Sequence, residues 1–96
     1  MKIDENIIIP DFMSVVYDMY VKRTNTLRDI KINTGIAYSH AFHIKDQLKV
    51  KGFISQETTG NGVKLSLTEK GEELGKNVEN IFIILNVKDY KKPKKK

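Results

Sequence analysis

The 96-residue chain has the size of one ordinary domain, and its 40% hydrophobic residues favour a globular fold over disorder. It contains no cysteine, which excludes disulfides and thiolate zinc sites. The longest apolar runs, 7–9 and 81–85, are too short to span a bilayer, and no apolar leader of the secretory type opens the sequence. We therefore expect a cytoplasmic protein without a membrane partner.

The net charge of +5 is unevenly distributed along the chain. Residues 91–96 carry five lysines, so the first ninety residues sum to zero. Within those ninety, residues 1–21 and 65–90 together sum to −5, whereas residues 22–64 hold eight basic and three acidic side chains. A basic middle between acidic flanks suits a surface that faces phosphate, because oriented positive charge attracts a polyanion. Chance clustering on a solvated surface is the alternative.

Apolar spacing and capping residues predict three helices in the first half of the chain. Apolar residues recur at helical intervals after a proline, which predicts a helix over 10–23. Thr26 and Asp29 match a capping box for a short second helix, which Gly35 ends. A third helix over 37–51 should follow at once. Its narrow apolar seam consists of Ala37, Ala41, Ile44 and Leu48.

The second half of the chain predicts a hairpin followed by a helix. Residues 53–57 and 63–67 are rich in β-formers, and the Gly-Asn-Gly at 60–62 fits the positive φ angles of a hairpin tip. Thr68 then caps a last helix that runs to about Val87.

This order of elements is the α+β winged helix-turn-helix arrangement, in which the helix after the turn enters the major groove of DNA. We expect a single winged-helix domain over residues 1–90, with a three-helix core, a β-hairpin wing and a C-terminal dimerisation helix. Its parts are the helix-turn-helix at 26–51, the wing at 53–67 and the C-terminal helix at 68–87, followed by a basic disordered tail at 91–96.

Four strings within residues 26–71 carry a resemblance to known regulators. The string TLRDI at 26–30 looks like the start of a first helix-turn-helix element, and TGI at 34–36 looks like its turn. The string LKVKGFI at 48–54 is similar to the exit from the recognition helix into the wing of such regulators, and LTEKG at 67–71 looks like their junction from wing to final helix. In this order and spacing, the chain resembles winged-helix regulators of the MarR and PadR type and small winged-helix proteins of archaea and their viruses.

The resemblance implies a sequence-specific transcription regulator that binds double-stranded DNA, is not an enzyme and is associated with the nucleoid. The chain departs from the usual pattern at His40, Phe42 and His43, where small polar residues or Arg often stand. The family's base preference is therefore not carried over. Two other functions remain open: a winged-helix protein-interaction module, in which Phe42 and Val50 face a protein partner, and a nonspecific architectural nucleic-acid binder dominated by the lysine tail.

A wheel at about 100° per residue indicates which side chains of the third helix face DNA. Ser39, Phe42, His43 and Asp46 lie opposite the apolar seam, and phosphate should repel Asp46 where the helix leaves the DNA. Lys64 beside the hairpin tip is the natural wing contact. The candidate DNA-binding residues are Thr26, Arg28, Tyr38, Ser39, His40, Phe42, His43, Lys45, Asn61 and Lys64.

Each candidate also has a simpler interpretation. Phe42 could pack against the wing or a partner chain, the two histidines could be ordinary surface residues, and Thr26 could serve only as a helix cap. Two histidines without a third ligand in the same segment give no metal site. We also find no catalytic constellation, phosphate-binding glycine loop or dinucleotide-binding pattern, and we expect no cofactor.

The final helix is more apolar than a helix that merely flanks a small domain. Its apolar run at 81–85 and the unassigned isoleucines at 7–9 would both be buried by a symmetric homodimer. The alternative is that the two patches cover each other within one chain. The candidate dimer residues are Leu74, Val78, Ile81, Phe82 and Leu85.

Overall fold

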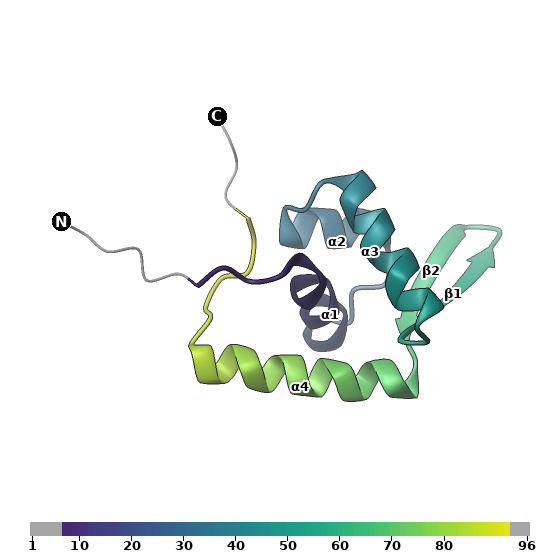
Figure 1. Ribbon diagram of the computed structural model, residues 1–96. Helices are drawn as coiled ribbons and strands as arrows, with labels where there is room; N and C mark the ends of the chain where they lie inside the picture. The colour runs from purple at the N-terminus through teal and green to yellow at the C-terminus, as the bar shows by residue number, and fades with distance from the viewer. Residues whose placement is uncertain (1–6, 93–96) are drawn as a thin grey trace.

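The computed structural model describes residues 7–92, which form four helices and one antiparallel pair of strands (Figure 1). The elements follow in the order α1 (Asp11–Val21), α2 (Leu27–Thr34), α3 (Tyr38–Val50), β1 (Ile54–Thr59), β2 (Gly62–Leu67) and α4 (Glu69–Leu85). This order confirms the predicted α+β class and the winged helix-turn-helix arrangement.

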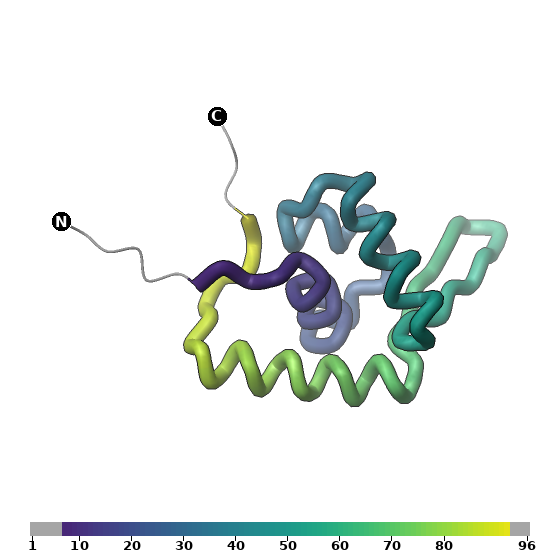
Figure 2. The backbone as a smooth tube through the Cα atoms, in the orientation of Figure 1, coloured from purple at the N-terminus to yellow at the C-terminus, as the bar shows by residue number. Residues whose placement is uncertain are grey.

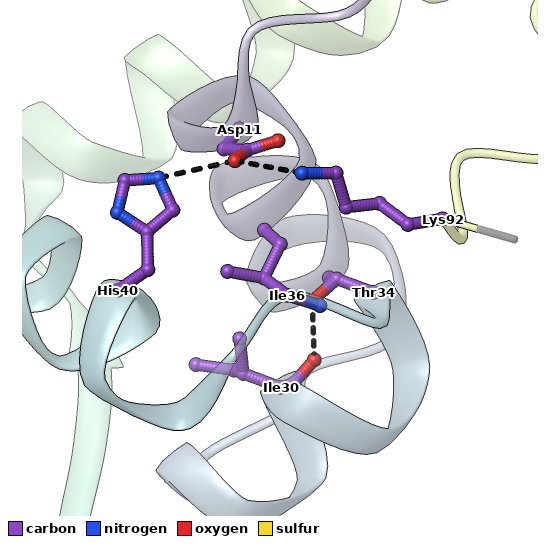
Figure 3. A network of polar contacts seen from close by, with 6 residues as sticks. All are labelled: Asp11, Ile30, Thr34, Ile36, His40 and Lys92. Carbon is purple, nitrogen blue, oxygen red and sulfur yellow. Dashed lines mark hydrogen bonds and ion pairs between the residues drawn. The ribbon is translucent and has the colours of Figure 1, made fainter. Parts of the chain in front are cut away.

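Local bonds build the turn between α2 and α3. The Thr26 hydroxyl accepts a hydrogen bond from the Asp29 N–H at 3.1 Å and caps α2, as predicted. α2 ends at Gly35, whose φ of 72° lies in the left-handed region that glycine adopts without steric cost. The buried Thr34 hydroxyl donates to the Ile30 carbonyl at 2.7 Å (Figure 3). The turn that aims α3 is thus fixed largely by its own residues.

The other predicted boundaries differ from the observed ones by at most two residues. α1 ends at Val21, short of the expected position 23, because Arg23 takes a φ of 57° that interrupts a right-handed helix. The strands extend further toward the tip than predicted, since Thr59 pairs with Gly62 and leaves a two-residue loop. Of the Gly-Asn-Gly tip, Gly62 alone has a positive φ, at 123°.

α1 lies between α4 on one side and the α2–α3 pair on the other (Figure 1). Two glycines allow α4 to approach its neighbours closely. A Cβ at Gly75 would lie 2.5 Å from Cγ of Tyr20, and one at Gly71 would overlap the Phe53 carbonyl. The buried apolar core consists of Val15, Val16, Met19, Ile30, Ile36, Ala41, Ile44, Leu48, Ile54, Leu65, Val78 and Phe82.

Part of the predicted dimer surface belongs to this core instead. Val78 and Phe82 are each 2% exposed, and Leu74 is partly buried against the same cluster. The Phe82 ring stacks on Tyr17 of α1, with the ring centroids 4.4 Å apart. The helical spacing of these residues is confirmed, but Val78 and Phe82 are buried in the core of the same chain, so these two side chains are not available to a partner.

The start of the predicted disordered tail is also ordered. Figure 2 shows the chain leaving the end of α4 and turning back beside the N-terminal segment. The Lys92 N–H donates to the Thr34 carbonyl at 2.9 Å, so Lys91 and Lys92 belong to the folded part of the chain. Residues 93–96, the rest of the predicted tail, lie outside the described residues, as do residues 1–6.

Candidate nucleic-acid interface

The outward face of α3 presents the side chains that the wheel predicts. Ser39, His43 and Asp46 are exposed, and Phe42 is 42% exposed. The edge of the Phe42 ring meets the His43 ring, with the ring centroids 6.4 Å apart. A hydroxyl, an imidazole and an apolar ring on one helix face can hydrogen-bond to base edges and contact a thymine methyl. The exposure of this face is confirmed, whereas its contact with DNA stays a prediction.

Lys45 is not available to phosphate in the way that the sequence suggested. Its side chain is 7% exposed, and its ammonium donates to the Asp46 carboxylate at 3.0 Å and to Oε1 of Gln56 in β1 at 3.1 Å. The same ammonium lies 4.2 Å from the centroid of the Phe42 ring, a cation–π distance. Lys45 therefore ties α3 to the wing and is not exposed for contact with phosphate.

The Lys45 bond also affects its partner. The hydrogen bond from Lys45 holds the pKa of the Asp46 carboxyl below its usual value. Asp46 is thus ionised at neutral pH on the exposed face of α3, and its place at the point where the helix leaves DNA stays a prediction.

His40 points toward α1. Its Nε2 lies 3.1 Å from Oδ2 of Asp11, and Nζ of Lys92 lies 3.2 Å from the same oxygen (Figure 3). The carboxylate therefore joins the first turn of α3 to α1 and to the C-terminal segment. His40 is about half exposed, but its Nε2 is engaged by Asp11 within the chain.

A groove of about 350 Å³ separates α3 from the inner face of the wing. It is lined by Tyr38 and Phe42 of α3, Val63 of β2, and Thr26 and Arg28 at the start of α2. Arg28 is exposed there, while the Thr26 hydroxyl is engaged in capping. The groove thus combines apolar rings with a guanidinium and the N-terminus of a helix, where an anion is stabilised.

The remaining candidates lie on the wing. Asn61 is exposed at the hairpin loop, and its N–H donates to the Thr59 hydroxyl at 3.2 Å. Lys64 is exposed on the outer face of β2 and pairs in register with Glu57 of β1. Opposite charges at facing positions attract, so Glu57 offsets part of the field of Lys64.

Sequence reasoning missed two of these contacts for different reasons. The burial of Lys45 had a signal, because it follows Ala41 by four residues and precedes Leu48 by three, which puts it on the apolar seam itself. The meeting of Asp11, His40 and Lys92 had none, since these residues are far apart in the chain and only the fold brings them together.

Residues 7–92 also lack two kinds of functional feature. In this range no group of three His, Cys, Asp or Glu side chains could hold a metal ion. No helix within it is long and apolar enough to cross a membrane.

Comparison with known proteins identifies the fold. No protein-family model and no curated protein matches the chain. Among solved structures, AF1382 from Archaeoglobus fulgidus superposes with a TM-score of 0.72 at 15% identity, over 81% of this chain and 90% of that one. F-93 of SSV1 superposes with a TM-score of 0.69 at 15% identity, over 84% of this chain and 90% of that one.

A longer regulator also matches. The MarR family transcriptional regulator SPO1453 from Silicibacter pomeroyi DSS-3 superposes with a TM-score of 0.67 at 15% identity, over 81% of this chain. The chain spans 57% of the length of that regulator. Such identities show a shared fold alone. The chain therefore has the winged-helix fold of the MarR family regulators, as the resemblance within residues 26–71 implied.

Proposed function

We propose that this protein is a transcription regulator that binds double-stranded DNA in a sequence-specific manner and has no catalytic activity. The observation that carries the proposal is the outward face of α3, which exposes Ser39, Phe42 and His43 on a helix-turn-helix fold. In this fold the helix after the turn enters the major groove, and its N-terminal part reads the bases. Such a protein would act in the cytoplasm, in association with the nucleoid.

The contacts divide into base-reading and phosphate-holding groups. Ser39, Phe42 and His43 would read base edges, since they share the exposed face of α3. Arg28 at the start of α2 and Lys64 with Asn61 on the wing would hold the backbone, where contacts fix orientation but carry no sequence information. Tyr38 borders the groove between α3 and the wing and could serve either purpose.

We also propose a homodimer formed through the exposed part of α4. Ile81, Ile84 and Leu85 share one helix face by their spacing, and they are 39%, 80% and 43% exposed. Ile83, which is 67% exposed, widens the apolar surface on another side of the helix. Burying a large apolar side chain stabilises an assembly by about 1.5–3 kcal/mol relative to leaving it in water. A two-fold pair would present two copies of α3 to one duplex, and the preferred site would then be a palindrome.

A salt titration of a labelled duplex, after selection from a random pool, tests this function. A regulator should select a sequence and bind it with a steep dependence of affinity on salt, because phosphate contacts release counterions. An architectural protein would give the steep dependence without a preferred sequence. A protein-interaction module would give neither, and that result would overturn the proposal.

Lys64→Gln provides the matched test of the division of labour. It should weaken binding to all duplexes alike and lower the slope of log affinity against log salt by about one. A change in the selected sequence would show that Lys64 reads bases and would contradict the assignment.

A further inference from the structure

The chain after α4 forms a strap that crosses the domain and ends beside the helix-turn-helix. Residues 87–92, hereafter the C-terminal strap, begin where Asn86 takes a left-handed φ of 58° and ends the helix. The Val87 N–H then donates back to the Phe82 carbonyl at 2.9 Å. Figure 2 shows the strap running from the end of α4 to the region of α2.

Tyr90 anchors the middle of the strap. Its hydroxyl donates to Oδ1 of Asp18 at 2.5 Å, and Asp18 is fully buried in α1. Asn33 of α2 donates to the other oxygen of this carboxylate at 3.1 Å. The Tyr90 ring meets Tyr17 edge to face, with the centroids 5.0 Å apart. A buried carboxylate needs such donors, because an unpaired charge in the interior is strongly destabilising.

Lys92 occupies the end of the strap, against the turn between α2 and α3. A Cβ at Gly35 would lie 3.0 Å from the Lys92 carbonyl oxygen and 3.2 Å from its nitrogen, so the strap sits close against the glycine. The Lys92 ammonium reaches Asp11, whose carboxylate also contacts His40 in the first turn of α3 (Figure 3). The strap thus ends next to the helix that the proposed function inserts into DNA.

The position of the strap matters for binding because its last residues are positively charged. The first ninety residues are neutral overall, and the net charge of +5 comes from residues 91–96. Lys91 and Lys92, which begin this basic run, are exposed. Figure 1 shows the strap beside the end of α2 and the β1–β2 hairpin on the far side of α3. The chain therefore carries basic groups on two sides of α3.

We propose that the C-terminal strap is a phosphate-binding arm, which holds Lys91 and Lys92 against the duplex backbone on the side of α3 opposite to the wing. This inference rests on the proposed function. An arm anchored at Tyr90 and Gly35 binds with less loss of conformational freedom than a free tail of the same charge. Its basic residues would act at a fixed distance from α3, and the protected stretch of DNA would extend on that side.

Four variants separate the effect of the strap's position from the effect of its charge. Lys91→Gln with Lys92→Gln removes two charges and keeps the anchor, whereas Tyr90→Ala removes the anchor and keeps the charges. Lys70→Gln with Lys76→Gln is the control, because both lysines are exposed on α4, lie outside the strap and carry the same total charge. Tyr90→Phe keeps the ring and removes the hydroxyl, in case the alanine variant does not fold.

The readout is the slope of log affinity against log salt for a selected duplex, together with the length of DNA protected from cleavage. Removing Lys91 and Lys92 should lower the slope by about one to two per bound chain, because the half-exposed Lys92 ammonium is shared with Asp11, and should shorten the protected stretch. Tyr90→Ala, or Tyr90→Phe in a weaker form, should shorten the same stretch although all lysines remain. The control should leave the protected stretch unchanged.

Two contrary results have distinct meanings. If the wild type binds duplex but the strap variants and the control behave alike, the strap is a structural tether and this inference is overturned while the proposed function stands. If the wild type fails to bind any duplex, the proposed function fails and the strap loses its ligand with it.

Discussion

Replacing Phe82 tests the packing of α4 against α1. Phe82 is 2% exposed, its ring stacks on Tyr17 at a centroid distance of 4.4 Å, and Tyr90 lies 6.3 Å away on the same ring cluster. Truncating a buried Phe to Ala costs about 3–5 kcal/mol, because the apolar contacts are lost and a cavity remains. A domain of this size has a free energy of unfolding of about 5–15 kcal/mol, so Phe82→Ala should remove a large share of it.

Urea unfolding followed by circular dichroism, at several protein concentrations, measures this loss. Val50→Ala is the control, because Val50 is 86% exposed and the change should stay within about 0.5 kcal/mol. Phe82→Leu should lose less than the alanine variant and keeps the test readable if that variant does not fold. A loss below about 1 kcal/mol for Phe82→Ala, or one that disappears at low protein concentration, would show that Phe82 serves an interface between chains and would refute this packing.

Four further predictions follow from the structure. Gly75→Ala should destabilise the protein by about 1–3 kcal/mol in urea unfolding, because its Cβ would meet the Tyr20 ring, whereas Gly60→Ala faces open space and should be nearly neutral; equal losses would contradict the close approach of α4 to α1. Burial and the Asp18 hydrogen bond raise the pKa of Tyr90 above its usual 10.0, so its stabilising contribution is complete below that pH and is lost as the pH rises toward the folded pKa. Urea unfolding at about pH 9 and about pH 11 should therefore show a steeper loss for the wild type than for Tyr90→Phe, and parallel losses would refute the effect. Ile84→Glu should convert a dimer into a folded monomer in sedimentation, and a wild type that is monomeric at micromolar concentration would sink the dimer proposal. Deleting residues 91–96 should weaken binding to every duplex and leave the selected sequence unchanged; an altered sequence would mean that these residues read bases.

The helices and the hairpin could be predicted because their signals are local. Thr26 and Thr68 both cap helices in the structure as their positions in the sequence predict, and Gly35 ends α2 in the left-handed conformation. Capping and turn chemistry depend on residues a few positions apart, which a single sequence displays directly. The order of these elements then limits the fold to few arrangements.

The partners of the apolar and charged side chains could not be predicted in the same way. The spacing of Val78 and Phe82 defines one face of α4, but it does not say whether α1 or a second chain covers that face. The order of Lys91 and Lys92 at the start of the tail could not be predicted for a related reason. A run of lysines predicts disorder by composition, whereas the order of Lys92 depends on Tyr90 and on the Thr34 carbonyl, which lies far away in the sequence.

For the candidate DNA contacts too, exposure could be predicted from local spacing, whereas the partners of the side chains could not. The exposure of Ser39 and His43 follows from helical periodicity and is confirmed. Helical periodicity does not say which ligand these exposed side chains bind. Lys45 and His40 are engaged within the chain, one by Gln56 and the other by Asp11, because tertiary contacts decide which exposed positions keep their polar atoms for a partner.

The most direct test of the central claim is a competition measurement with the double variant Ser39→Ala, His43→Ala. A selected duplex and a random duplex compete for the wild type and for the variant. If the outward face of α3 reads bases, the wild type should prefer the selected duplex, and the variant should lose about 1–3 kcal/mol of that preference for each base contact removed, with its affinity for random DNA nearly unchanged. An unchanged preference in the variant would contradict the assignment of α3 as the helix that reads the sequence.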